Sequence, residues 1–191
     1  LFIPADSQMY PAPYRTHVCV EEITQTMCGA SRPGHFNGVT TVVAKLFNAV
    51  QPQKAYFGQK DAQQAAVIRR MTKDLDFPIE IVVCPTVREA DGLAMSSRNS
   101  YLSPQERQAA TVLYRALSVA KAAFDSGERN AETLRQSMAE TIQSEPLAKM
   151  QYISCADYDT LEELDTVRGK TLLSMAVSIG KTRLIDNFVL G

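Results

Sequence analysis

The middle of the sequence alternates between helical and strand patterns, and this alternation limits the chain to a few folds. From Val39 to Val50, apolar residues recur at intervals of three and four, as on the buried face of a helix. A strand-like segment at 54–57, a second helical pattern at 62–75 and a segment at 79–84 that is apolar except for Glu80 follow. Because continuous apolar strands are typical of parallel sheets that are covered on both faces, the pattern predicts an α/β layer.

The first 38 residues have weaker patterns. The chain starts with neither Met nor a basic segment, so we expect the end of a strand from a longer chain rather than a signal peptide. The residues that follow are expected to form, in order, a strand end at 1–4, a loop at 7–14, a strand at 16–20, a short helix at 21–28 and a glycine-rich loop at 29–38.

The second half of the chain has a different organisation. A long polar connection at 85–103 ends in the capping box Ser103–Glu106, which predicts a helix to about residue 126 that is closed by Gly127. A second helix is expected after Asn130, followed by strands at 150–157, 171–179 and 182–189, the last two joined as a hairpin. We therefore expect two domains, residues 1–87 and residues 88–191, the second a small α+β domain.

The composition excludes some functions. With 20 Lys and Arg against 21 Asp and Glu, the chain has no excess of positive charge for nucleic acid, and no nucleic-acid partner is expected. The longest apolar runs, 65–68 and 79–84, are far shorter than the ~20 residues that span a bilayer, so no membrane partner is expected either. The four cysteines form no close Cys-x-x-Cys pair; thiols buried in a reducing cytoplasm are the expectation for Cys19, Cys28, Cys84 and Cys155.

The segment FGQKDAQQ, residues 57–64, is the first candidate site. A strand ends here, Gly58 permits a sharp turn, and Asp61 is placed to cap a helix that begins at Ala62. Free N–H groups at a helix start, with the Lys60 ammonium beside them, favour an anion such as a nucleotide phosphate. The alternatives are an ordinary strand-to-helix turn and a plain cap.

The segment AMSSRN, residues 94–99, is the second candidate site. The hydroxyls of Ser96 and Ser97 and the guanidinium of Arg98 are suitable donors to phosphate oxygens, and two anion sites on opposite sides of a hinge would be able to close on one triphosphate. The alternative is a solvated loop. His35, beside Arg32, is either a ligand contact or a loop histidine bonded to the backbone. Gln63 and Gln64 are expected to be solvated, with binding of a carboxylate or hydroxyl as the alternative for Gln64. Val42 and Val43 are expected in the core, and Met95 is expected to cover an apolar surface.

Four segments in the same order and with matching spacing resemble the pantoate–β-alanine ligase family. They are SRPGHFNGV at 31–39, FGQKDAQQ at 57–64, DGLAMSSRN at 91–99 followed by YLSPQER, and TRLIDN at 182–187. The resemblance implies a partial Rossmann-like nucleotidyltransferase domain followed by a small α+β lid domain with a three-stranded antiparallel sheet. It also implies a two-step reaction in which pantoate and ATP give pantoyl adenylate and pyrophosphate, and β-alanine then displaces AMP to give pantothenate.

The resemblance also implies roles for individual residues. Mg²⁺ accompanies the ATP phosphates, no metal is held by the protein alone, and the intact enzyme is a homodimer. ATP would be bound by Gly58, Lys60, Asp61, Val87, Met95, Ser96, Ser97 and Arg98, of which Lys60, Ser96, Ser97 and Arg98 also act in catalysis. Pantoate would be bound by Gln64, Val42 and Val43.

Two departures from the family pattern matter. The family usually has Glu at the position of Gln59 and an aromatic residue at Ala62, which puts the fine shape of the ATP pocket in question. A His-x-Gly-His motif that contacts ATP lies upstream of Leu1 in the family, so we expect the chain to be the C-terminal two-thirds of the enzyme and inactive alone. The alternatives are a non-catalytic nucleotide-binding or dimerisation module and another nucleotidyltransferase of the same superfold.

Overall fold

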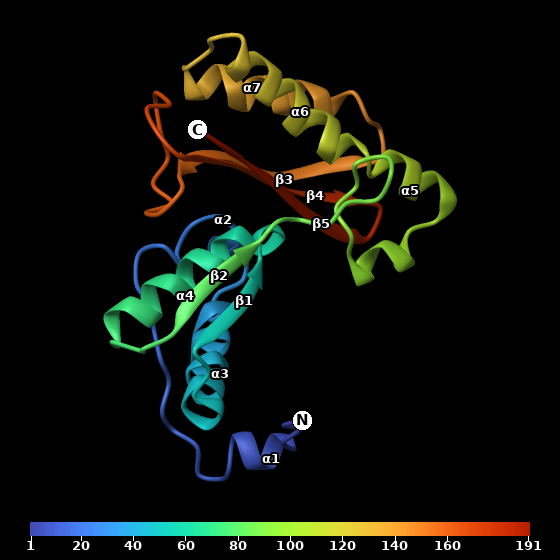
Figure 1. Cartoon of the computed structure of the whole chain (residues 1–191). Helices are drawn as coiled ribbons and strands as arrows, with labels where there is room; N and C mark the ends of the chain where they lie inside the picture. The colour runs from blue at the N-terminus through green and yellow to red at the C-terminus, as the bar shows by residue number, and fades with distance from the viewer. The chain divides into compact units, whose positions relative to one another are not determined.

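A computed structural model describes residues 1–191 (Figure 1). The chain forms two compact units. The first unit contains residues 1–57 and 63–83, and the second contains residues 58–62 and 84–191. The polypeptide therefore enters the second unit for five residues before it returns to complete the first.

The first unit is built around a β-α-β arrangement. Its helices are α1 (Asp6–Met9), α2 (Met27–Ser31), α3 (His35–Val50) and α4 (Ala62–Asp74). Its strands β1 (Lys54–Gly58) and β2 (Glu80–Cys84) pair with each other in a two-stranded parallel sheet and are connected through α4. The amphipathic helix α3 and the two short strands form the α/β layer that the sequence pattern predicts.

The core of the first unit is small. Ala44 and Phe47 of α3 pack with Ile68 and Met71 of α4, and apolar side chains from both strands close the cluster. The ring of Phe47 meets the ring of Phe77 edge-on, with centroids 5.6 Å apart. This cluster packs both helices against the sheet.

Several expectations for the first 38 residues are wrong. Neither 1–4 nor 16–20 is a strand, and the short helix expected at 21–28 is instead α2, whose five residues lie largely inside the segment expected to be a loop. Residues 16–20 run along α3, where Thr41 Oγ1 accepts a hydrogen bond from the backbone N–H of Val18. A helix therefore satisfies the backbone group that a neighbouring strand was expected to satisfy.

The second unit contains an antiparallel sheet with helices on one face (Figure 1). Strands β3 (Ala148–Asp157), β4 (Thr171–Ile179) and β5 (Thr182–Leu190) pair in sequence order, and β4 and β5 form the expected hairpin. The helices are α5 (Pro104–Ala109), α6 (Val112–Asp125) and α7 (Ala131–Gln143). Two short 3₁₀ helices, η1 (Gln59–Asp61) and η2 (Ser97–Tyr101), also belong to this unit.

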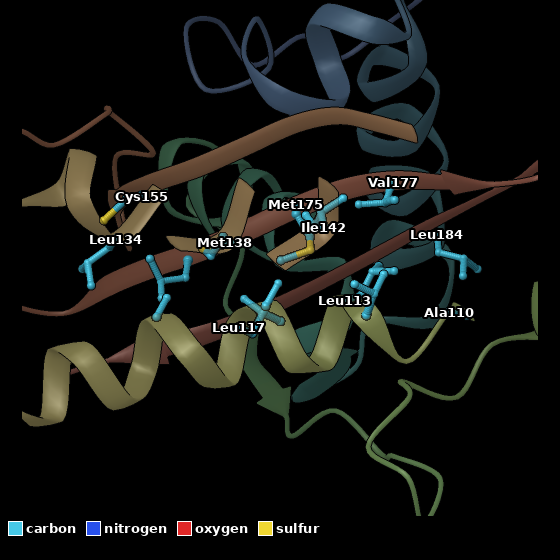
Figure 2. Close-up of a cluster of buried hydrophobic side chains, with 14 of the residues drawn as sticks. Ala110, Leu113, Leu117, Leu134, Met138, Ile142, Cys155, Met175, Val177 and Leu184 are labelled. Atoms are coloured by element: carbon cyan, nitrogen blue, oxygen red, sulfur yellow. The ribbon is translucent and has the colours of Figure 1, made fainter. Parts of the chain in front are cut away.

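The larger core lies between the helix pair and the sheet of the second unit. Figure 2 shows Leu113 and Leu117 of α6 and Met138 of α7 together with Met175 and Val177 of β4. Cys155 is buried in the same cluster, and burial raises the pKa of its thiol to about 11. Burial is confirmed for this cysteine, whereas Cys19 is exposed.

The capping signals of the second half are confirmed, with one difference. Ser103 and Glu106 form the capping box, and the Asn130 side chain accepts a hydrogen bond from the N–H of Thr133 at the start of α7. The single helix expected from 104 to 126 is two helices, because the chain turns at Ala110 and Thr111 between α5 and α6. No helix of the structure has the length and apolar character needed to cross a bilayer.

Candidate functional site

The first candidate segment forms a 3₁₀ turn rather than a capped helix start. Gly58 has φ −78° and ψ 134°, which any residue adopts, so the turn does not depend on glycine's conformational freedom. Gln59–Asp61 form η1, and α4 continues from it directly at Ala62. Asp61 is therefore the last residue of the 3₁₀ turn, inside a continuous helical path, and not the extended residue of an N-cap. The expectation that Asp61 caps the helix is wrong. Lys60 is partly buried and Asp61 is exposed.

The turn is attached to strand β5 by one buried side chain. Asn187 donates its amide hydrogens to the carbonyl oxygens of Gln59 and Lys60, each at 3.0 Å. The Gln59 amide donates to Asn187 Oδ1 at 2.9 Å, and the hydroxyl of Tyr158 donates to Gln59 Oε1 at 3.2 Å. Gln59 is thus a donor as well as an acceptor, and a carboxylate at this position has no hydrogen for Asn187 Oδ1.

The second candidate segment follows a short antiparallel turn. Arg88 pairs with Ala94, and the N–H of Met95 donates to the carbonyl of Val87 at 2.9 Å. Gly92 is at the tip with φ +91°, where a Cβ atom would meet the ring of Tyr114. Val87 and Met95 are thereby placed side by side on the backbone, and they are 67% and 56% exposed.

An ion pair fixes this turn to the same strand. Arg88 binds Asp186 through two hydrogen bonds of 2.6 and 2.8 Å and also donates to the carbonyl of Gly92 at 2.9 Å. The guanidinium lies about 5 Å from the ring centroids of Tyr114 and Phe188. The Asp186 side chain is 1% exposed, so loss of the Arg88 guanidinium would leave a buried carboxylate without its ionic partner.

The hydroxyl and guanidinium groups of the second segment are accessible. Ser96 Oγ accepts a hydrogen bond from the N–H of Arg98 at 3.2 Å and begins η2. Ser97 and Arg98 are exposed. The segment is a 3₁₀ turn whose Ser97 and Arg98 side chains are exposed, and its ligand-binding role stays a prediction.

A cluster of Arg107 and two carboxylates is hydrogen-bonded to η2 through Asn99. Arg107 of α5 bonds to Glu89 at 2.7 Å and to Asp91 at 2.8 Å, and Asn99 donates to Glu89 at 3.0 Å. Hydrogen bonds from Arg107 lower the pKa values of both carboxyls, and for Glu89 the bond from Asn99 adds to this effect.

The remaining candidates lie in the first unit. Gln63 is 6% exposed and was wrongly expected to be solvated: it accepts from the N–H of Cys28 and donates to the carbonyls of Ile23 and Thr26. Gln64 is partly buried. Val43 packs against the core of the unit, Val42 is partly buried, and His35 begins α3 beside Arg32, with 3.3 Å between His35 Nε2 and an Arg32 nitrogen.

In the second unit, the turn that carries Lys60 and the segment that carries Ser97 and Arg98 contact the same strand. Both η1, which carries Lys60, and η2, which begins with Ser97 and Arg98, contact β5. Ammonium, guanidinium and hydroxyl groups on segments that contact one strand are suitable donors to a polyanionic ligand. Sequence reasoning missed Arg88, Asp186, Asn187 and the buried role of Gln63; the motif TRLIDN contains two of them but gives no role by itself.

Comparison with known proteins agrees with this architecture. The family model of pantoate–β-alanine ligase matches residues 1–189. The chain belongs to the pantoate–β-alanine ligase family. It is 60% identical over 189 residues to the pantothenate synthetase of Heliobacterium modesticaldum, covering 99% of this chain and 67% of that relative. Against the pantothenate synthetase of Roseiflexus sp. the identity is 59% over 190 residues, with 68% of that relative covered.

Solved structures of the family have the same fold. Pantothenate synthetase from Thermus thermophilus matches with a TM-score of 0.93 and 45% identity, over 97% of this chain and 67% of that one. Pantoate–β-alanine ligase from Francisella tularensis, crystallised with β,γ-ATP and β-alanine, matches with a TM-score of 0.70 and 33% identity, over 96% of this chain and 62% of that one. The predicted fold class, with a parallel sheet and a separate three-stranded antiparallel sheet, is confirmed.

Proposed function

We propose that the protein carrying this chain joins pantoate to β-alanine at the expense of ATP. In the first step a carboxylate oxygen of pantoate attacks the α-phosphorus of ATP, the bond from that phosphorus to the bridging oxygen breaks, and pyrophosphate leaves. In the second step the neutral amine of β-alanine attacks the acyl carbon, AMP leaves with the pantoate oxygen, and one proton is released. Membership of the family and the contact of both donor segments with β5 support the proposal.

The residues have distinct roles in this scheme. Lys60, Ser96, Ser97 and Arg98 stabilise negative charge that builds up on the departing phosphates, because cationic and hydroxyl donors fixed in advance need no reorganisation during the reaction. Gly58 and Asp61 bind the ribose, Val87 binds the adenine through its backbone, and Met95 closes over ATP together with Ser96, Ser97 and Arg98. Gln64, Val42 and Val43 bind pantoate. No protein nucleophile is needed, so catalysis depends on positioning and charge.

Magnesium is treated as part of the nucleotide substrate. Residues 1–191 contain no group of three or more His, Cys, Asp or Glu side chains arranged to hold a metal ion. We propose that Mg²⁺ arrives on the ATP phosphates and shields their charge, while the side chains of this protein bind the same phosphates from other directions.

The single observation that carries the proposal is the attachment of the Lys60 turn and the Ser96–Arg98 segment to one strand of one unit. The direct test is pyrophosphate exchange into ATP, measured with pantoate present and β-alanine absent. We expect exchange that requires pantoate and that falls ~100-fold or more in Lys60→Ala, the range for loss of one charge-stabilising group.

Lys54→Ala is the matched control for this substitution. Lys54 is also a lysine of the β1 region, but it forms a surface ion pair with Glu80 at 2.8 Å and its side chain is 53% exposed. Because such pairs contribute little to stability, this variant should exchange pyrophosphate at the wild-type rate. ATP binding without any pantoate-dependent exchange would instead favour a non-catalytic nucleotide-binding module.

Three further expectations accompany the proposal. The assembled enzyme is a homodimer in the cytoplasm, which light scattering and cell fractionation test. Residues 1–87 and residues 88–191 are separate domains, so residues 88–191 should fold when expressed alone. Measurements of their secondary structure and unfolding test this. None of these expectations is needed for the exchange experiment.

A further inference from the structure

Asn187 binds two consecutive backbone carbonyls, those of Gln59 and Lys60. Its amide nitrogen donates to the carbonyl oxygens of Gln59 and Lys60, and its amide oxygen accepts from the Gln59 side chain. The residue is 4% exposed and lies in β5, the edge strand next to the central strand β4. A buried side chain with all three bonds made on one turn fixes that turn in space.

Asp186, the preceding residue of β5, holds the other donor segment in a similar way. It binds the Arg88 guanidinium through two hydrogen bonds, and Arg88 in turn binds the carbonyl of Gly92 at the tip of the turn that leads to Met95. The N–H of Asn187 also donates to Asp186 Oδ1 at 2.8 Å, which links the two residues.

We propose that Asp186 and Asn187 form a positioning pair, which sets the spacing between the Lys60 turn and the Ser96–Arg98 segment. This inference rests on the proposed function, because it assigns to that pair the geometry of the phosphate-binding groups. Neither residue touches the substrates: Asn187 acts through the backbone of Lys60, and Asp186 acts through Arg88.

The reason for such a pair is the flexibility of lysine. The Lys60 ammonium sits on a four-carbon stem with many rotamers, so its average position depends on where its backbone is held. The Asn187 amide binds the carbonyl of Lys60 itself. If the turn shifts by about 1 Å, charge stabilisation at the phosphates is lost even though the lysine is still present.

The test is a double-mutant cycle between Asn187→Ala and Lys60→Ala, with pantoate-dependent pyrophosphate exchange in the full protein as the readout. In the wild-type background we expect Asn187→Ala to lower kcat about 10-fold or more, with a smaller change in the KM for pantoate. In the Lys60→Ala background we expect less than about a twofold further loss, because the group that Asn187 positions is already absent. Equal factors in both backgrounds, or no effect in the wild type, would overturn the inference.

Asp186 is tested in the same way through Asp186→Asn and Arg98→Ala. Asparagine keeps the shape of the side chain but removes the charge that pairs with Arg88. We expect Asp186→Asn to lower the rate of pantoate-dependent pyrophosphate exchange in the wild-type background and to lower it little further in the Arg98→Ala background. Losses that multiply in the double variant would show that Asp186 does not position this segment.

A matched control separates positioning from general destabilisation. Asn130→Ala also removes an asparagine hydrogen bond from the second unit, the cap of α7, and should lower the melting temperature with kcat unchanged. Where Asn187→Ala does not fold, Gln59→Ala removes the bond to Asn187 Oδ1 from the other side and leaves Asn187 in place. It should show a smaller loss with the same dependence on Lys60.

Hydrogen exchange distinguishes failure of this inference from failure of the proposed function. In the substrate-free protein, amides of residues 58–64 should exchange faster in Asn187→Ala than in Asn130→Ala, while amides of α7 should show the reverse. A wild-type protein without pantoate-dependent exchange rejects the proposed function. Unchanged protection at 58–64 rejects the positioning role of Asn187 whether or not the function holds.

Discussion

Gln63 and Gln64 are adjacent in sequence but have different surroundings. Gln63 is 6% exposed and makes three hydrogen bonds to the backbone of residues 23–28, whereas Gln64 is partly buried at the start of α4. Gln63 therefore holds the loop before α2 against α4. Gln64 remains the residue that we propose for pantoate binding.

Gln63 and Gln64 give a prediction at the scale of single residues. Gln63→Ala should lower the free energy of unfolding of the first unit by about 1–3 kcal/mol, because three part-buried backbone groups lose their partner. Gln64→Ala should change stability by less than ~0.5 kcal/mol and raise the KM for pantoate. Urea unfolding and steady-state kinetics of both variants test this, and equal destabilisation would show that Gln64 also has a structural role.

Sequence patterns identify residues by type and spacing, and this limit is visible at single positions. Lys60, Ser96 and Arg98 are recognisable because charged and hydroxyl side chains cluster in glycine-containing segments. Asn187 and Gln63 are not, since their partners lie 128 and 35 positions away and include backbone groups that every residue has. Only the register of β5 and the packing of α4 bring these groups together.

At the scale of elements, strong local signals predicted boundaries well and weak ones did not. The capping box at Ser103, the cap at Asn130 and the β4–β5 hairpin lie where the sequence places them. Residues 16–20 do not form a strand, and the N–H and carbonyl of Val18 are satisfied by Thr41 and Thr40 of α3 rather than by another strand. The hydrogen-bond partners of this segment depend on tertiary contacts, which cannot be predicted from the alternation of apolar residues.

The contact between α5 and the turn at 88–94 should make stability depend on pH. Hydrogen bonds from Arg107 lower the pKa values of Glu89 and Asp91 below their ordinary values of 4.5 and 3.8. The unfolded chain therefore binds more protons in acid, so this stabilisation is present above about pH 5 and is lost as the pH falls through the lowered folded-state values.

Arg107→Gln should reduce this loss. Between about pH 5 and pH 3 its free energy of unfolding should fall less steeply than that of the wild type. Arg115→Gln makes the same change in net charge at an exposed position of α6 and should keep the wild-type slope. Urea unfolding at a series of pH values measures both, and identical slopes for Arg107→Gln and the wild type would contradict the assignment.

At the scale of the whole molecule, the two units have unequal cores. Of the twelve largest fully buried side chains, Ile68 and Met71 lie in the first unit and ten lie in the second. Hydrophobic burial is the main stabilising contribution to folding, so the second unit should be the more stable of the two.

Hydrogen exchange tests this difference in stability. Amides of β4 and α6 should be the slowest to exchange, and amides of α3 and α4 should exchange through openings of lower free energy. Mass spectrometry of peptides from the native protein distinguishes the two units. Equal protection of α4 and β4 would mean that the chain unfolds as one cooperative unit.

The measurement that tests the central claim most directly is the transfer of oxygen from pantoate to AMP. Pantoate labelled with ¹⁸O in both carboxylate oxygens is incubated with the full protein, Mg-ATP and β-alanine, and the AMP is analysed by mass spectrometry. Formation of pantoyl adenylate predicts AMP that carries one ¹⁸O atom, because the attacking oxygen stays on the α-phosphorus when the amine displaces it. Pantothenate formed together with unlabelled AMP, or with ADP in place of AMP, would contradict the adenylate route and the roles proposed for Lys60 and the Ser96–Arg98 segment.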